Sequence, residues 1–337
     1  MPESWTLQQS DKVALGAGVR SLRLVALAGR VNLIGTDGPA TLEVSRISGP
    51  PLYVERSDDG ALVVRHGEYG KPPQLLRWLL GGGRTEVDLS LALPPDAVLD
   101  VKVLSGPVVV SNFHEGVSVK GATGEVTLAG VHGSARVTTV SGAITAEQVT
   151  GDLTVKAVSG AITVMAGAGG AIDLTAVSGA ISVDLEDPVP STVKLQCVSG
   201  AMTVRLPHDP DMSVDLGTGN GRAVSAFPQV RASGTRGSQK LAGTIGGGRA
   251  TLVGKTLSGA VTLLRRSADA DEDPWDLMFD DVPPDRTPTT PAPQDRATQD
   301  RAPQDQIPEN QITDAGGTAP DGNGATPDNG ENSEDAR

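Results

Sequence analysis

Four histidines and one cysteine are the side chains of this sequence best suited to catalysis or metal binding. His114 and His132 are 18 residues apart and could face each other as a metal-binding pair, but no third ligand accompanies them. Cys197 is the sole thiol, and its place just before a repeated phrase predicts a structural role at a corner. The glycines at 81–83 and 246–248 lack the Lys-Ser/Thr of a phosphate-binding loop. We therefore predict a protein that is not an enzyme, with no catalytic, cofactor-binding or metal-binding residues.

A repeated six-residue phrase organises the chain instead. Its copies are Val140-Ser-Gly-Ala-Ile-Thr145, Val158-Ser-Gly-Ala-Ile-Thr163, Val177-Ser-Gly-Ala-Ile-Ser182, Val198-Ser-Gly-Ala-Met-Thr203 and Leu257-Ser-Gly-Ala-Val-Thr262. The first two steps between copies are 18 and 19 residues long. A fixed period of this size indicates stacked copies of one small unit.

A second, weaker phrase lies between the copies and halves the period. It reads Val131-x-Gly133-x-Ala135-x-Val137, and the strong phrase reads Val140-x-Gly142-x-Ile144-x-Ala146. Alternation of apolar or Gly with polar residues over seven positions is typical of a strand buried on one face. We therefore predict an all-β fold, a β-solenoid with coils of about 18 residues, two strands per coil and inward columns of Val, Gly and Ile/Val/Leu.

Three regions are expected along the chain. Residues 1–100 hold irregular strands and several of the few aromatic residues, and we expect them to form an N-terminal β cap region of the solenoid. Residues 101–266 form the repeat solenoid, and residues 267–337 form a disordered tail rich in Pro, Asp and Gln. Within the first region, Gln74-Leu-Leu-Arg-Trp-Leu-Leu80 is interpreted as a helical turn of the cap, with a membrane-touching loop as the alternative.

Composition narrows the classes of partner. The tail from Ser267 holds 18 acidic and 4 basic residues, which leaves 23 acidic and 24 basic residues in the rest of the chain. Such a neutral body offers no electrostatic footprint for a nucleic acid, and an aromatic content of 2% argues against stacking platforms. No small-molecule ligand or cofactor is expected. No apolar run is long enough to span a membrane and no signal peptide is apparent at the N-terminus, so we expect a cytoplasmic protein.

One tail segment differs from its surroundings. Asp271–Asp281 places apolar side chains inside a run of acids, and these are Trp275, Leu277, Met278 and Phe279. Such a cluster is interpreted either as a segment that folds back on the last coil or as a motif that docks on a partner.

The strong phrase also predicts a candidate interaction face. Its odd positions should point outward from one flat, small and uncharged sheet, and they are Ser141, Ala143, Thr145, Ser159, Ala161, Thr163, Ser178, Ala180 and Ser182. Two readings stay open. The columns simply suit stacked strands, or they form a docking surface for a protein partner, a second copy, or the chain's own N-terminal part.

The chain from about residue 5 to 266 resembles the bacterial putative-adhesin family of β-strand-repeat proteins, a family of unknown biochemical function common in actinobacteria. The resemblance rests on phrases in the same order and spacing, which are Ala28-Gly-Arg-Val-Asn-Leu-Ile34, Leu93-Pro-Pro-Asp-Ala97, the Val-Ser-Gly-x-Ile-Thr repeats, Leu216-Gly-Thr-Gly-Asn-Gly221 and Leu257-Ser-Gly-Ala-Val-Thr-Leu-Leu264. It implies a β-solenoid domain. The hypothesis is then a non-enzymatic, adhesin-like scaffold or protein-interaction module. The alternatives are a self-assembling cytoplasmic structural protein like the bactofilins, or an exported adhesin.

Overall fold

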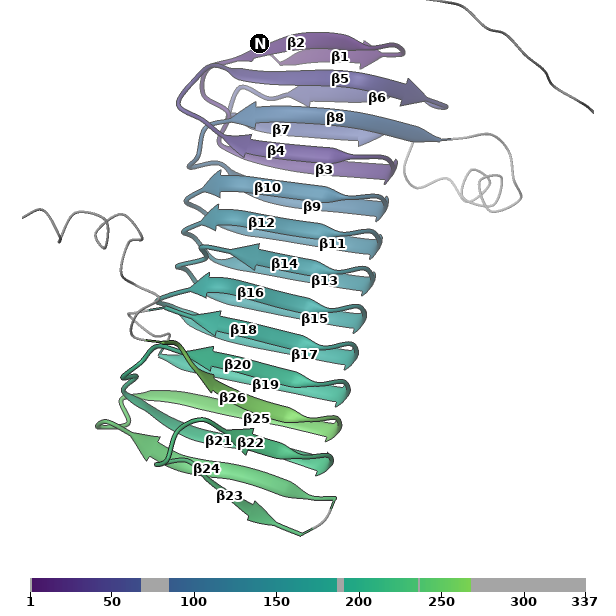
Figure 1. The fold of residues 1–337 in the computed structure, drawn as a ribbon. Helices are drawn as coiled ribbons and strands as arrows, with labels where there is room; N and C mark the ends of the chain where they lie inside the picture. The colour runs from purple at the N-terminus through teal and green to yellow at the C-terminus, as the bar shows by residue number, and fades with distance from the viewer. Residues whose placement is uncertain (1, 68–84, 187–190, 236, 268–337) are drawn as a thin grey trace, which may run out of the picture. The chain divides into compact units, whose positions relative to one another are not determined.

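The alternating pattern of the repeats folds into strands throughout the part of the chain that the structure, a computed structural model, describes. That part comprises residues 2–67, 85–186, 191–235 and 237–267. Every helix or strand assigned within it is a β-strand, and the strands pair into two long sheets (Figure 1). The predicted all-β fold is confirmed.

Sheet A has fourteen strands in the described part of the chain. In spatial order they are β1 (Glu3–Leu7), β6 (Leu52–Arg56), β7 (Ala61–His66), β3 (Ser21–Ala28), β9 (Val98–Ser105), β11 (Val117–Thr123), β13 (Ala135–Ser141), β15 (Leu153–Ser159), β17 (Ala171–Ser178), β19 (Thr192–Ser199), β25 (Ala250–Ser258), β21 (Met212–Asn220), β24 (Gln239–Ile245) and β23 (Arg231–Gly234).

Among the described residues, sheet B has twelve strands. In spatial order they are β2 (Asp11–Gly16), β5 (Ala40–Ser48), β8 (Glu86–Leu93), β4 (Val31–Gly35), β10 (Val108–Phe113), β12 (Val126–Val131), β14 (Ile144–Glu147), β16 (Ile162–Gly167), β18 (Ile181–Leu185), β20 (Met202–Leu206), β26 (Val261–Arg265) and β22 (Ala223–Ser225).

Each coil in the middle of the stack contributes one strand to each sheet, and neighbouring coils pair in parallel. Ala135 of β13 lies opposite Val117 of β11 and Leu153 of β15, so each step to the next coil advances the sequence by 18 residues. In sheet B, Ile144 lies opposite Val126 and Ile162 with the same offset. The predicted solenoid with two strands per coil is therefore confirmed.

The core lies between the two sheets and consists of aliphatic columns. Val137, Val155 and Leu174 form one such column in sheet A, and each is fully buried. Ile162 on β16 is fully buried, whereas the next residue, Thr163, is partly exposed. Each buried Val or Ile contributes about 1.5–3 kcal/mol relative to an exposed one. The stack is thus stabilised by many similar increments.

The predicted position of the corners is wrong, because the corner from sheet A to sheet B lies inside the repeated phrase and not between phrases. The phrase Val140–Thr145 was expected to be one strand, but sheet A ends at Ser141 and sheet B begins at Ile144, so the phrase spans a corner. Val140 is 54% exposed and points outward, although it was expected in the core. The physical reason is that the period-2 pattern continues through the corner, where Gly142 has a φ of +133° and turns the chain.

Antiparallel pairing distinguishes the N-terminal end from the repeated coils. The strands β3 and β4 still pair in parallel with β9 and β10. Farther out, β6 is antiparallel to β7 and to β1, and β5 is antiparallel to β8 and to β2. Trp5 lies on β1 and Tyr53 on β6, where the sequence predicted a cap. The predicted helical turn at 74–80, with Trp78, and Tyr69 lie outside the described residues.

The C-terminal end contains a crossover in the order of the coils. The final coil of the sequence, β25 and β26, lies between the coil of β19 and β20 and the coil of β21 and β22. Beyond it, β24 is antiparallel to β21 and to β23. Both edges of the final coil are therefore already paired within the described part of the chain.

Candidate functional site

A column of glycines forms the corner that joins sheet A to sheet B. Gly124, Gly142 and Gly160 have φ values of +132°, +133° and +132°, a region that disfavours every residue with a side chain. The N–H of Gly142 donates a hydrogen bond of 3.1 Å to the carbonyl oxygen of Ser159 in the next coil. These glycines, which were expected in an inward column, turn the chain at the corner.

The predicted interaction face bends around this corner and is not one flat sheet. Ser141, Ser159 and Ser178 end strands of sheet A, and the alanines lie in the corner. Thr145, Thr163 and Ser182 lie at the start of strands of sheet B. Ser141, Ser159 and Ser178 are stacked in register, and so are Thr145, Thr163 and Ser182. The residues Ala143, Ala161 and Ala180 are exposed. The structure thus brings each column together, and the three columns form a curved, uncharged ridge.

A column of exposed aliphatic side chains runs beside this ridge on the outer face of sheet A. We call it the apolar column, and it consists of Val140, Val158, Val177, Val198 and Leu257, with exposed fractions between 46% and 65%. The register of sheet A places its members on five successive strands. Sequence reasoning missed it because the same valines were assigned to the core. The signal was the Ser-Gly pair that follows each of them and marks the end of a strand.

The apolar column borders a groove of about 800 Å³ over β17, β19 and β25. Two further rows of outward residues complete the groove. Across the three strands, one row is Thr175, Gln196 and Lys255, and another is Asp173, Lys194 and Val253, of which Asp173 lies just outside the groove lining. The residues that line the groove include two lysines and no carboxylate. Its lining is therefore apolar along one side and carries two lysines on the other, and Asp173 lies in register beside one of them, Lys194.

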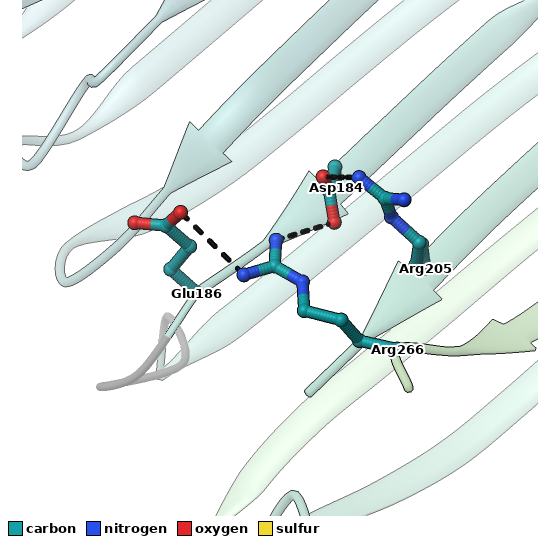
Figure 2. Close-up of polar contacts among 4 residues, drawn as sticks. All are labelled: Asp184, Glu186, Arg205 and Arg266. Atoms are coloured by element: carbon teal, nitrogen blue, oxygen red, sulfur yellow. Dashed lines mark hydrogen bonds and ion pairs between the residues drawn. The ribbon is translucent and has the colours of Figure 1, made fainter. Parts of the chain in front are cut away.

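Four charged side chains form a network on sheet B where β26 ends (Figure 2). Arg266 donates a hydrogen bond of 2.9 Å to Asp184 and lies 3.5 Å from Glu186, and Arg205 also binds Asp184. Burial alone would raise the pKa of Asp184, but hydrogen bonds from Arg205 and Arg266 outweigh burial and hold it below its usual value. The network ties the residue that follows β26 to β18, two coils away.

The side chains considered first for chemistry are placed as follows. The rings of His114 and His132 lie with their centroids 5.3 Å apart and are tilted by 56°; His114 hydrogen-bonds Asp96, and His132 hydrogen-bonds Thr150. No group of three or more potential metal ligands occurs among the residues that the structure describes. Cys197 is buried within β19 and does not lie at a corner as predicted. Burial raises the pKa of its thiol, which disfavours the reactive thiolate.

Two predictions remain, one on the tail motif and one on membrane-spanning helices. The tail motif of Trp275, Leu277, Met278 and Phe279 lies outside the described residues. Within the described part of the chain, no helix has the length and apolar character needed to cross a membrane.

Comparison with known proteins identifies a family. The model of the family described as Toastrack DUF4097 matches residues 67–264, which are 198 of the 337 residues. None of the curated proteins compared with the chain matches it.

Three solved structures are similar to the chain. A "putative cell adhesion protein" from Clostridium sporogenes is 15% identical, with a TM-score of 0.24, and covers 79% of this chain and 100% of its own. A "putative adhesin" from Parabacteroides distasonis is 12% identical, with a TM-score of 0.31, and covers 78% and 97%. A "putative lipid binding protein" from the same species is 13% identical, with a TM-score of 0.36, and covers 78% and 96%.

Proposed function

This chain belongs to the Toastrack DUF4097 family, and we propose that it is a non-enzymatic, adhesin-like scaffold that binds a protein partner along one edge of its stack. The observation that carries the proposal is the apolar column beside the uncharged ridge. Aliphatic side chains that are half exposed on five successive strands form a contiguous patch, and such patches on soluble proteins mark interaction surfaces.

The chemistry of this edge favours binding over catalysis. Each coil presents an aliphatic residue, a serine, an alanine and a threonine or serine in turn, as in Val158, Ser159, Ala161 and Thr163. None of these side chains titrates near neutral pH, and the same set repeats from coil to coil. A repeating neutral surface suits a partner that contacts several coils at once.

The ends of the stack favour a scaffold over a self-assembling filament. A filament of stacked coils needs ends at which a second copy continues the parallel pairing. Here β1 and β23 lie at the edges of sheet A and are each antiparallel to their neighbours, and β22 at an edge of sheet B has only three residues. Short or reversed edge strands oppose end-to-end addition. Light scattering coupled to size-exclusion chromatography should therefore give the mass of one chain.

The experiment that tests the proposal places a charge on the ridge. Ala161→Arg in the full chain should change the free energy of unfolding by no more than about 0.5 kcal/mol, because the side chain is exposed. A partner docked there would have to desolvate an unpaired guanidinium, so binding should weaken at least about tenfold. The measurement is affinity capture from the host's extract, followed by quantitative mass spectrometry.

The matched control is Met165→Arg. Met165 lies on β16 of the same coil, is 39% exposed, and is outside the ridge. We expect the control to retain the captured proteins that Ala161→Arg loses. An identical set of captured proteins for the wild type and Ala161→Arg would refute the proposed surface. The cytoplasmic location stays a prediction, and cell fractionation would separate it from the exported adhesin.

A further inference from the structure

We propose that the groove over β17, β19 and β25 is occupied by the chain's own acidic segment, residues 271–281. The inference rests on the proposed function, because it assigns an internal occupant to one part of the same interaction surface. Occupation by the chain itself would make that part of the surface available to a partner only when the segment leaves.

The groove has two chemical requirements for an occupant. Val177, Val198 and Leu257 form its apolar side, and they are 46%, 48% and 65% exposed. Lys194 and Lys255 supply positive charge on its other rows. Asp173 on β17 lies in register with Lys194, whereas the groove residues in register with Lys255, Thr175 and Gln196, carry no charge. An occupant should therefore present large apolar side chains beside carboxylates.

The segment 271–281 has this composition. Its sequence, Asp-Glu-Asp-Pro-Trp-Asp-Leu-Met-Phe-Asp-Asp, contains six acidic residues and no basic one. Trp275, Leu277, Met278 and Phe279 bring together four large apolar side chains, in a tail that is otherwise poor in them. Opposite charges across such a contact fix its register and disfavour other occupants.

The root of the tail is held close enough for this segment to reach the groove. Arg266 is anchored by Asp184 and Glu186 (Figure 2), and Arg265 hydrogen-bonds the His208 carbonyl oxygen. In the same loop, 207–211, the carbonyl oxygen of Asp211 accepts a hydrogen bond from the N–H of Ala250. The end of β26 and the start of β25 therefore lie at the same edge of the stack.

The path from this edge to the groove has two parts. It crosses the sheet-to-sheet spacing of about 10 Å and then follows β25 for about five residues, or about 17 Å. Trp275 is eight residues beyond Ser267. Eight residues span at most about 26–29 Å when extended, so Trp275 reaches the start of the groove and the residues after it lie along the groove.

The size of the surface favours a short segment over a second copy of the chain. The groove is lined by twelve residues, whereas a stable interface between proteins uses about 20–30 residues on each side. Three residues of the apolar column lie at the groove and span two steps between strands, about 10 Å. A five-residue stretch such as 275–279 is long enough to cover them.

A fluorescent synthetic peptide with the sequence of residues 271–281 tests the proposal. The peptide is added to two proteins, which we call its hosts. One is the full chain carrying Trp275→Ser, Leu277→Ser, Met278→Ser and Phe279→Ser, and the other is the wild type. Fluorescence anisotropy should show binding to the substituted chain. Apparent affinity for the wild type should be at least about tenfold weaker, because a tethered segment competes at an effective concentration near millimolar.

Two further variants of the substituted chain locate the peptide. Lys255→Glu should abolish peptide binding by reversing a charge of the groove. Lys120→Glu is the matched control and should leave it unchanged, because Lys120 also points outward from sheet A but lies on β11, away from the groove. Circular dichroism melting curves of all hosts should match, which excludes unfolding as the cause of lost binding.

The outcomes separate this inference from the proposed function. Equal binding to both hosts would overturn occupation by the chain's own segment, while the groove would remain a binding surface. Binding to neither host would also overturn the inference, and the capture experiment with Ala161→Arg would still decide the proposed function. A doubled mass of the wild type by light scattering, lost in the chain with the four substitutions, would assign the segment to a second copy and overturn the internal contact.

Discussion

Gly142 lies directly against Gly124 in the corner column: a β-carbon added to Gly142 would be 1.9 Å from the carbonyl oxygen of Gly124. The same contact recurs one coil later, where a β-carbon on Gly160 would be 2.1 Å from the carbonyl oxygen of Gly142. Because the neighbour is backbone that is itself hydrogen-bonded, it cannot move aside for one residue without moving the coil. The corner thus sets the spacing between coils.

Gly142→Ala should therefore destabilise the protein by roughly 3 kcal/mol or more, since strained φ and a backbone clash add. Gly130→Ala is the control for strain alone. Gly130 has a φ of +62°, and its nearest neighbour to an added β-carbon is 3.9 Å away, so the cost should be about 1–2 kcal/mol. Urea denaturation of both variants measures the difference. Similar costs would show that the corner tolerates a side chain.

Ile162→Ala should cost about 2–5 kcal/mol, because it leaves a cavity at a fully buried position of sheet B. Thr163→Ala, one residue along and partly exposed, should cost far less. Thermal and urea unfolding of the two variants tests the register of β16. Equal losses would mean that inside and outside are exchanged.

Stability should fall as the pH drops below about 6.5, in part because of His66. This side chain is fully buried at the end of β7, and burial lowers its pKa. A lowered pKa means that the unfolded chain binds more protons between the folded pKa and about 6.5. The stabilisation is therefore present above pH 6.5 and lost as the pH falls.

His66→Leu should remove this part of the pH dependence. The measurement is the free energy of unfolding of both proteins at intervals from pH 7.5 to pH 5. We expect the wild type to lose stability relative to the variant over that range. A difference between the two that does not change with pH would contradict the assignment.

Asp184→Asn should cost about 1–2 kcal/mol at pH 7, because Arg205 and Arg266 lose a charged partner. The folded pKa of Asp184 lies below its unfolded value of about 3.9, so its stabilising effect is present above that pH. The effect is lost as the pH falls through the folded pKa. Denaturation of both proteins between pH 5 and pH 2 should show their stabilities converge, and a constant gap would refute the role of the carboxylate.

The repeat unit was predictable from the sequence because every coil repeats the same physical solution. The 18-residue step and the alternation of buried and exposed residues are local, so counting along the chain reveals both. The position of the corners within the repeat could not be predicted. The exposed Val140 and the turning Gly142 continue the same period-2 pattern as the buried Ile144. Polarity alone cannot separate an aliphatic residue in the core from one on the edge of the stack.

The order of the coils at the C-terminal end could not be predicted from the sequence either. Strands β21 and β25 pair in parallel, although β22, β23 and β24 lie between them in the chain. That pairing depends on which edges meet in space, and no local pattern encodes it. The groove was missed for the same reason, because its lysines come from β19 and β25, whose adjacency follows from this crossover.

The place of the final coil has a consequence for biosynthesis. Residues 250–266 are made after β21–β24, yet they fill the gap between that group and β19 and β20. Until the ribosome has released them, β19 and β20 present open strand edges that invite aggregation and proteolysis. A chain truncated anywhere before Ala250 keeps those edges open permanently. The wedge position of the last coil therefore makes closure of both sheets depend on the strands of the stack that are synthesised last.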